Sequence, residues 1–391
     1  MRRTPKSRGL VVVLLLVQWA LLLNAATQLS ATIDEPFHIT SGYEYLRTGK
    51  LQLFDEHAPV AKALFAWPLF FVPDLAPPES AAGYADGNLI SAAQETLLAY
   101  RPLDRVIVAP RVAAALLTVL LAGSIYTVAR NLAGPEAGLL ALALCAFDPN
   151  FLAHGSLATT DMGATAFSFW ALWAGSRWLK APTRRNWLLA AALLGLAQGA
   201  KLTTLLLYPV LGLGVLFNAE TRRVLTQRER RVLTQSREDA ECAENSKAET
   251  QRVLTQRRSA GYSDAEAQRR TSIRQFSSIA NGAGYSGLLE FSALVGVSLL
   301  VLWALYGFEL RPVAGLFGGM PLPAASHIER WLRLQANLAY GREAFLLGQN
   351  SMHGWWFYFP VAFLIKTPLP LLLLGGYAVI RGVFAAALSG S

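Results

Sequence analysis

Residues 9–26 read GLVVVLLLVQWALLLNAA and follow the basic segment MRRTPKSR at residues 1–8. A run of this length approaches the roughly 20 apolar residues that an α-helix needs to cross a bilayer. The segment is either a cleavable signal peptide, with NAA at its end as a cleavage site, or a retained signal anchor. Its length and Trp19 favour the anchor. In both cases the segment that follows Thr27 lies on the external side of the membrane.

Apolar runs recur along the rest of the chain. They cover residues 106–129, 136–148, 162–179, 187–199, 202–218, 287–307 and 355–380. Of the 391 residues, 53% are hydrophobic and 16% are charged, which is too apolar for an ordinary soluble domain. The continuous Leu, Ala and Val blocks also exclude a β-barrel, whose segments alternate. The sequence therefore predicts an all-α polytopic membrane protein with about eight transmembrane helices.

Lys and Arg are concentrated in alternate loops of this scheme. By the positive-inside rule, residues 129–136, 177–187, the segment after Asn218, and Arg381 lie inside. The predicted external parts are residues 28–105, 149–161, a tight turn near Lys201, and residues 308–354. The net charge of +9 therefore needs no nucleic-acid partner. Cys145 and Cys242 lie near opposite membrane faces, so we expect no disulfide between them.

The segment 219–285 differs from the rest of the chain. RRVLTQ occurs at 222–227 and again at 230–235, and QRVLTQ follows at 251–256, without a fixed period. We expect a mostly solvated cytoplasmic insert and not a solenoid. The predicted organisation is a membrane module at 1–218, the insert at 219–285, and a C-terminal membrane segment at 286–391 with the external loop 308–354.

The first external loop carries an unusual density of polar groups. DEPFHITSGYEYLRTG, residues 34–49, predicts a helix that begins near Asp34 and ends at Gly49. APVAKALFAWPLFFVP, residues 58–73, predicts an amphipathic element in the membrane interface. On a helix, Asp34 and His38 share a face. Asp34 is therefore either a functional carboxylate or a helix cap, and the two roles are compatible.

The stretch from Asp34 to Lys62 resembles the first external loop of the GT-C membrane glycosyltransferases, in particular the protein O-mannosyltransferase branch and its bacterial relatives. These carry an Asp-Glu pair after the first span and then a His-Pro-Pro-x-x-Lys motif. Here HAPVAK, residues 57–62, keeps His57, Pro59 and Lys62, while Ala58 replaces the first proline. Three further segments resemble the family, at residues 148–172, 195–211 and 353–374.

The resemblance implies an inverting transfer of a sugar from a polyprenyl-phosphate carrier to an acceptor hydroxyl on the external face. Asp34 would be the general base. Lys62 would stabilise the leaving phosphate. Asp161 either positions a sugar or caps the next span, and Glu35 is either a supporting partner or a solvated neighbour. His57 would shape the loop or contact the phosphate.

The roles that we expect for the remaining polar residues are less specific. His38 is expected to make a structural hydrogen bond, and His154 and His353 are candidate cavity residues. Lys366 either snorkels or faces the lipid phosphate where prolines break the last apolar run. We expect no metal or other cofactor, the alternative being a divalent cation held by Asp34 and Asp161.

Two other function classes remain open at this point. A flippase or transporter of lipid-linked sugars would place its polar groups near the bilayer midplane, whereas here they lie in external loops. A structural membrane protein would not need these carboxylates and lysines. The expected partners are a polyprenyl-phosphate-linked sugar, the membrane, and a protein, glycan or lipid acceptor. The expected location is the plasma membrane, or the endoplasmic reticulum in a eukaryote.

Overall fold

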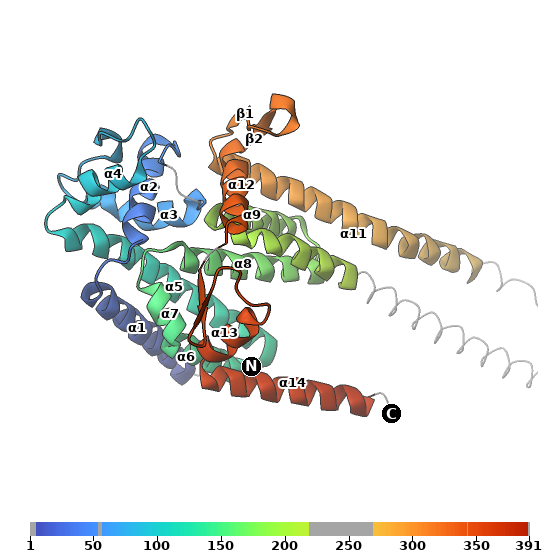
Figure 1. Ribbon diagram of the computed structural model, residues 1–391. Helices are drawn as coiled ribbons and strands as arrows, with labels where there is room; N and C mark the ends of the chain where they lie inside the picture. Colours follow the sequence, from blue (N-terminus) through green and yellow to red (C-terminus); the bar gives the residue numbers. More distant parts are fainter. Residues whose placement is uncertain (1–4, 54–56, 219–268, 342, 390–391) are drawn as a thin grey trace, which may run out of the picture. The chain divides into compact units, whose positions relative to one another are not determined.

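The computed structural model describes residues 5–53, 57–218, 269–341 and 343–389 (Figure 1). Its elements are almost all helical. The first half contains α1 (Pro5–Gln28), α2 (Glu35–Thr48), α3 (Pro59–Ala66), the 3₁₀ helices η1 (Trp67–Phe71) and η2 (Pro78–Ser80), α4 (Leu89–Ala92), the π-helical turn η3 (Ala93–Leu98) and α5 (Leu103–Ala133). Then follow α6 (Pro135–Phe147), α7 (Pro149–Gly155), α8 (Thr160–Lys180), α9 (Arg184–Ala200) and the 3₁₀ helix η4 (Leu202–Leu206).

The C-terminal part combines long helices with two small hairpins. It contains α11 (Arg269–Leu305), β1 (Leu310–Pro312), η5 (Phe317–Gly319), β2 (Pro321–Pro323), α12 (Ala325–Ala339), β3 (Ala344–Leu346), β4 (Gln349–Ser351), α13 (Tyr358–Lys366) and α14 (Leu369–Ser389). Strands β1 and β2 pair antiparallel, as do β3 and β4. The predicted all-α class is therefore confirmed. Helix α11 begins within the predicted insert, whose residues 219–268 lie outside the described part of the chain.

Three described helices are long and apolar enough to cross a membrane: Arg8–Gln28 in α1, Leu103–Ala133 in α5, and Gly287–Leu305 in α11. The number rises to five if each of two bent helix pairs is one span. The chain is a multi-pass membrane protein, but the predicted count of eight helices is not confirmed. The other predicted spans correspond to helices that are bent, shorter or less apolar.

Prolines explain both bent pairs. Helices α6 and α7 meet at an angle of 57°, with Pro149 at the start of α7, so part of the predicted external loop 149–161 is helical. Helices α13 and α14 meet at 114°, where Thr367 is extended before Pro368. A residue before proline disfavours the helical conformation. The predicted apolar run 355–380 therefore forms two helices, and the proline break that is one of the two alternatives for Lys366 is present.

The chain forms two compact units, each of which is discontinuous in sequence. One contains Met1–Trp173, Ala192–Leu205 and Ser298–Ser391, and the other contains Ala174–Ala191 and Leu206–Val297. In the second unit, the indole Nε1 of Trp187 donates to the carbonyl oxygen of Glu290 at 3.0 Å. All candidate site residues lie in the first unit. The three-part division by sequence stays a prediction.

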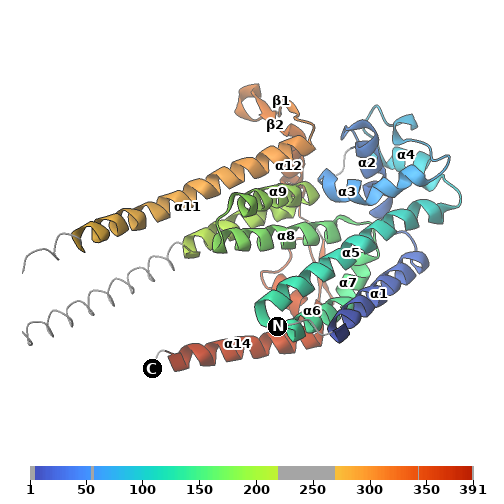
Figure 2. The ribbon, with the colours of Figure 1, turned by 180° about the vertical axis from the view of Figure 1, so that it is seen from behind.

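In the first unit, α1 packs against α5 and α6, and α2, α3 and α4 gather beside the N-terminal end of α5 (Figures 1 and 2). Helix α2 ends as its sequence predicts, because Gly49 adopts a left-handed conformation with φ of 67°. Gly42 allows α3 to approach closely, since a Cβ there would clash with the carbonyl oxygen of Lys62. Ile39 and Phe65 are buried at this contact. The packing fixes the two segments that carry the predicted site.

Candidate active site

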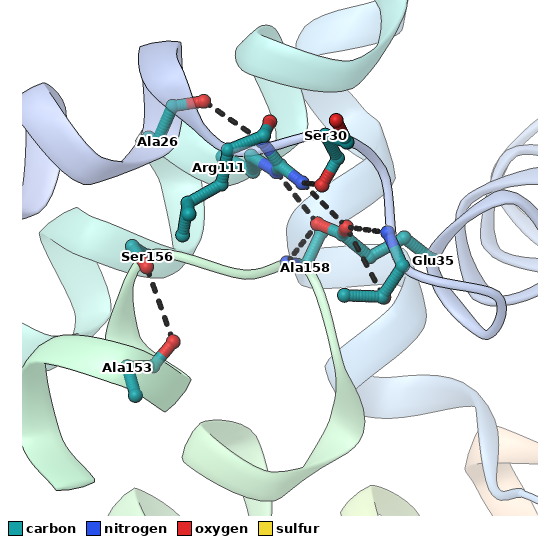
Figure 3. Close-up of polar contacts among 9 residues, drawn as sticks. Ala26, Ser30, Glu35, Arg111, Ala153, Ser156 and Ala158 are labelled. Atoms are coloured by element: carbon teal, nitrogen blue, oxygen red, sulfur yellow. Dashed lines mark hydrogen bonds and ion pairs between the residues drawn. The ribbon is translucent and has the colours of Figure 1, made fainter.

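A buried ion pair joins the start of α2 to α5 (Figure 3). Arg111 donates from Nε to Oε1 of Glu35 at 2.8 Å and from Nη2 to Oε2 at 2.7 Å. The guanidinium also donates to the carbonyl oxygens of Ala26, Leu29 and Ser30, at 2.7 to 2.8 Å. All five of its N–H donors are therefore used. The arrangement ties the end of α1 to the start of α2.

The same carboxylate also holds the segment before α8. Glu35 accepts hydrogen bonds from the backbone N–H of Ala158 at 2.9 Å, and from the N–H and hydroxyl of Thr32 at 2.9 and 3.2 Å. Burial alone would raise the pKa of Glu35, but Arg111 and these N–H groups together lower it below its usual value. Because Glu35 is fully buried, the alternative of a solvated neighbour is wrong. Its contacts favour a positioning role over proton transfer.

Asp34 has the opposite environment although it is adjacent to Glu35. It occupies the N-cap position of α2, and its carbonyl oxygen accepts the N–H of His38 at 3.0 Å. Its side chain makes no capping hydrogen bond and is exposed. The expected capping role is therefore limited to the backbone. The carboxylate remains available to a ligand.

Asp161 lies in the first turn of α8 and binds a lysine from another helix end. Its Oδ1 lies 2.5 Å from Nζ of Lys201, the residue that follows α9. Its Oδ2 lies 3.9 Å from Nδ1 of His154 on α7. Burial alone would raise the pKa of Asp161, but Lys201, His154 and His57 together lower it. With 47% of its side chain exposed, Asp161 is an accessible, charged carboxylate.

His57 connects α2 with the Asp161 cluster, which consists of Asp161, Lys201 and His154. Its ring lies 4.9 Å from the ring of His38, edge to face, and its charge influences Asp161. His38 is buried, as a structural role predicts. The structure therefore brings His57 and His154 into the neighbourhood of Asp161. The role of His57 toward a phosphate stays a prediction, and the neighbouring Asp55 and Glu56 lie outside the described residues.

Lys62 is only 1% exposed, which was not expected for a phosphate ligand. It lies near Glu44, a buried carboxylate that also accepts the backbone N–H groups of Gln52 and Leu53. Burial raises the pKa of Glu44, while those N–H groups and Lys62 partly oppose the rise. A phosphate can reach the Lys62 ammonium only if the residues that cover it move. Its role in donor binding stays a prediction.

The two remaining predicted residues lie near the C-terminal hairpin and the α13–α14 bend. Lys366 ends α13 with its side chain exposed, and its carbonyl oxygen accepts the side-chain N–H of Asn150 at 3.0 Å. Asn150 belongs to α7, which also carries His154, so the backbone of Lys366 lies beside that helix. His353 is exposed, and among the described residues its side chain makes no hydrogen bond or ion pair with Asp161, Lys201 or His154.

A metal site finds no support in the part of the chain that is described. No group of three or more His, Cys, Asp and Glu side chains there has a spacing that could hold an ion. The absence of a cofactor stays a prediction. Cys145 is described, whereas Cys242 lies outside the described residues, so the expected lack of a disulfide is likewise untested.

Residues 103–233 match the sequence model of the dolichyl-phosphate-mannose-protein mannosyltransferase family. The predicted family resemblance is confirmed over this segment. Comparison with curated proteins gave no match. Among solved structures, the protein O-mannosyltransferase Pmt1–Pmt2 complex of S. cerevisiae, bound to its sugar donor, is similar with 15% identity and a TM-score of 0.49. The similarity covers 78% of this chain and 34% of that one, so the chain spans about a third of the yeast protein's length.

The segment that matches the mannosyltransferase family contains two charged residues of the site, Arg111 and Lys201, that the sequence pattern does not assign to it. Arg111 lies within the apolar run 106–129. A charged residue inside a predicted span is itself a signal of function or of pairing with another charge. Lys201 lies at a predicted tight turn within the family-like segment 195–211, and neither feature identifies it as the partner of Asp161. Asp161 and His154 lie in the matched segment, whereas Asp34 precedes it. The structure joins these parts through the hydrogen bond from Ala158 to Glu35.

Proposed function

We propose that this protein is an inverting glycosyltransferase of the protein O-mannosyltransferase type. It would move a mannose-like sugar from a polyprenyl-phosphate carrier to an acceptor hydroxyl at the external face of the membrane. The observation that carries the proposal is the bridge made by Glu35. It joins the segment bearing the exposed carboxylate of Asp34 to the one that leads into Asp161 and its partner Lys201.

The proposed reaction is a single displacement. The acceptor oxygen attacks the anomeric carbon while the bond from that carbon to the phosphate oxygen breaks, and polyprenyl phosphate leaves with the electron pair. Asp34 takes the hydroxyl proton, for which an exposed and uncommitted carboxylate is suited. Asp161, held by Lys201, is suited to accept hydrogen bonds from sugar hydroxyls. Cations near the leaving phosphate would stabilise its growing charge, a role assigned to Lys62, His57 and Lys366.

The family match to residues 103–233 supports a lipid-linked sugar as donor. The acceptor in our proposal is a protein hydroxyl, with a glycan or lipid acceptor as the alternative. The protein would act in the plasma membrane, or in the endoplasmic reticulum of a eukaryote, with residues 28–105 and 149–161 outside. No nucleic-acid role is included, because the basic residues follow the loop pattern of a membrane protein.

A lipid-linked sugar transporter is the competing function, and one assay separates the two. Purified protein in liposomes would be offered radiolabelled polyprenyl-phosphate mannose together with a Ser/Thr-rich peptide. We expect labelled mannose attached to the peptide and one molecule of free polyprenyl phosphate released for each mannose transferred. Label that crosses the membrane while still attached to its lipid, without any glycosylated product, would show that the protein is a transporter.

Lys201→Met should change the pH dependence of transfer. Lys201 lowers the pKa of Asp161, whereas burial raises it, so loss of the ammonium should raise that pKa. If Asp161 acts as a carboxylate, the acid limb of the kcat/KM profile should move to higher pH. Lys201→Arg should restore much of the original profile, because it keeps the charge.

The matched control is Lys180→Met, which removes an exposed lysine at the other end of α8. It should leave the pH profile unchanged. If Lys201→Met lowered kcat/KM at every pH without moving the acid limb, Lys201 would only support the fold around Asp161.

A further inference from the structure

An apolar cavity of about 710 Å³ lies between η1 and the first turns of α5. Its walls include Trp67, Phe71, Val108, Val112 and Leu116. The volume falls within the range of about 300–1,000 Å³ that is typical of small-molecule sites. None of the predicted catalytic residues lines it. The cavity is therefore distinct from the candidate active site.

The position of the cavity points to the bilayer as the source of its occupant. One wall is α5, whose residues Leu103–Ala133 are long and apolar enough to cross a membrane. The other wall is η1, where Phe71 is 75% exposed and Trp67 is 45% exposed. Exposed aromatic side chains beside the end of a span are typical of the membrane–water interface. A hydrocarbon chain is the ligand that matches these walls.

The polar residues of the cavity determine which lipid fits. Asp104 and Arg105, both exposed in the first turn of α5, are its only charged lining residues, one of each sign. Among the described residues, neither side chain has a hydrogen-bond or ion-pair partner in the structure. A headgroup with one phosphate and one primary ammonium matches this pair of charges. Polyprenyl phosphate matches it less well, because it offers Asp104 only negative charge.

We propose that this cavity binds the acyl chain of a phosphatidylethanolamine, with its phosphate at Arg105 and its ammonium at Asp104. The lipid would be a structural ligand at the outer end of α5. It would support the packing of η1 on α5. The site is independent of the transferase proposal, because it can be measured by lipid binding without any turnover.

The test compares three lipids on detergent-purified, delipidated full-length protein. Dioleoyl phosphatidylethanolamine, phosphatidylcholine and phosphatidylglycerol would be titrated one at a time, with bound lipid counted by native mass spectrometry. Phosphatidylcholine lacks ammonium N–H donors, and phosphatidylglycerol lacks the cation. We expect phosphatidylethanolamine to bind about two- to fivefold more tightly than either, the range that one exposed ion pair supports.

Two variants locate the binding. Ala109→Trp fills the cavity from the α5 wall and should remove the tightest bound phosphatidylethanolamine. Leu132→Trp adds the same ring at an exposed position near the other end of α5 and should leave binding unchanged. Asp104→Asn should abolish the preference over phosphatidylglycerol while binding of both lipids persists.

Three outcomes would overturn the proposal. Unchanged binding in Ala109→Trp would place the lipid elsewhere. Equal binding of all three lipids to the wild type would show that the charged pair does not select a headgroup. Tighter binding of phosphatidylglycerol, or binding of polyprenyl phosphate that Ala109→Trp removes, would identify the occupant of the cavity as an anionic lipid.

Discussion

Asp34→Asn is expected to lower turnover at least about a hundredfold while donor binding stays close to that of the wild type. Asparagine has nearly the size of aspartate but cannot accept the proton of the acceptor hydroxyl. The side chain is exposed and makes no capping hydrogen bond, so the start of α2 should not depend on it. The measurement is single-turnover transfer of labelled sugar, with the equilibrium binding of donor determined separately.

Asp86→Asn is the matched control, because it removes another exposed carboxylate from the same predicted external loop. It should transfer sugar at the wild-type rate. If Asp34→Asn were nearly fully active, Asp34 would be a helix-start residue alone and another group would have to take the proton. A loss of donor binding equal to the loss of turnover would instead assign Asp34 to ground-state recognition.

Arg111→Met is expected to produce the largest loss of stability. It leaves the Glu35 carboxylate buried without its ion-pair partner and removes the donors to three carbonyl oxygens. Breaking a buried ion pair from one side typically costs about 3–5 kcal/mol. The expected result is a lower unfolding temperature in detergent and a smaller fraction of monodisperse protein. Folded molecules that survive should have lost the attachment of the Ala158 segment.

The ion pair between Arg47 and Glu79 serves as the control for the buried pair. Their charged groups are 2.8 Å apart, but the side chains are 34% and 29% exposed. Arg47→Met should therefore cost no more than about 1 kcal/mol. The double variant Glu35→Gln/Arg111→Met should recover part of the stability, since it leaves no buried charge. Equal stability of Arg111→Met and Arg47→Met would contradict the role assigned to the buried pair.

Local signals in the sequence were sufficient for the helix that presents the site. Helix α2 begins after Asp34 and ends before Gly49, as its proline near the start and its glycine after the end predict. The apolar runs likewise predicted α1, α5 and the apolar half of α11. These features depend on residues within one or two helical turns of each other, so they can be predicted from the sequence alone.

The contacts that assemble the site depend on residues far apart in sequence. Arg111 reaches Glu35 across 76 positions, and Lys201 reaches Asp161 across 40. A linear reading could not show which buried or half-buried charges neutralise each other. For the same reason it could not show that Lys62 is buried beside Glu44 while Lys201 is more exposed. The roles of these residues in catalysis stay predictions.

The most direct test of the central claim is a single-turnover reaction with an excess of purified protein over labelled polyprenyl-phosphate mannose and with a Ser/Thr peptide as acceptor. We predict one polyprenyl phosphate released for each mannose attached to the peptide, with inversion at the anomeric carbon. The same reaction in Asp34→Asn should be at least about a hundredfold slower. Release of sugar to water without a peptide product, or transfer at the wild-type rate in Asp34→Asn, would contradict this account.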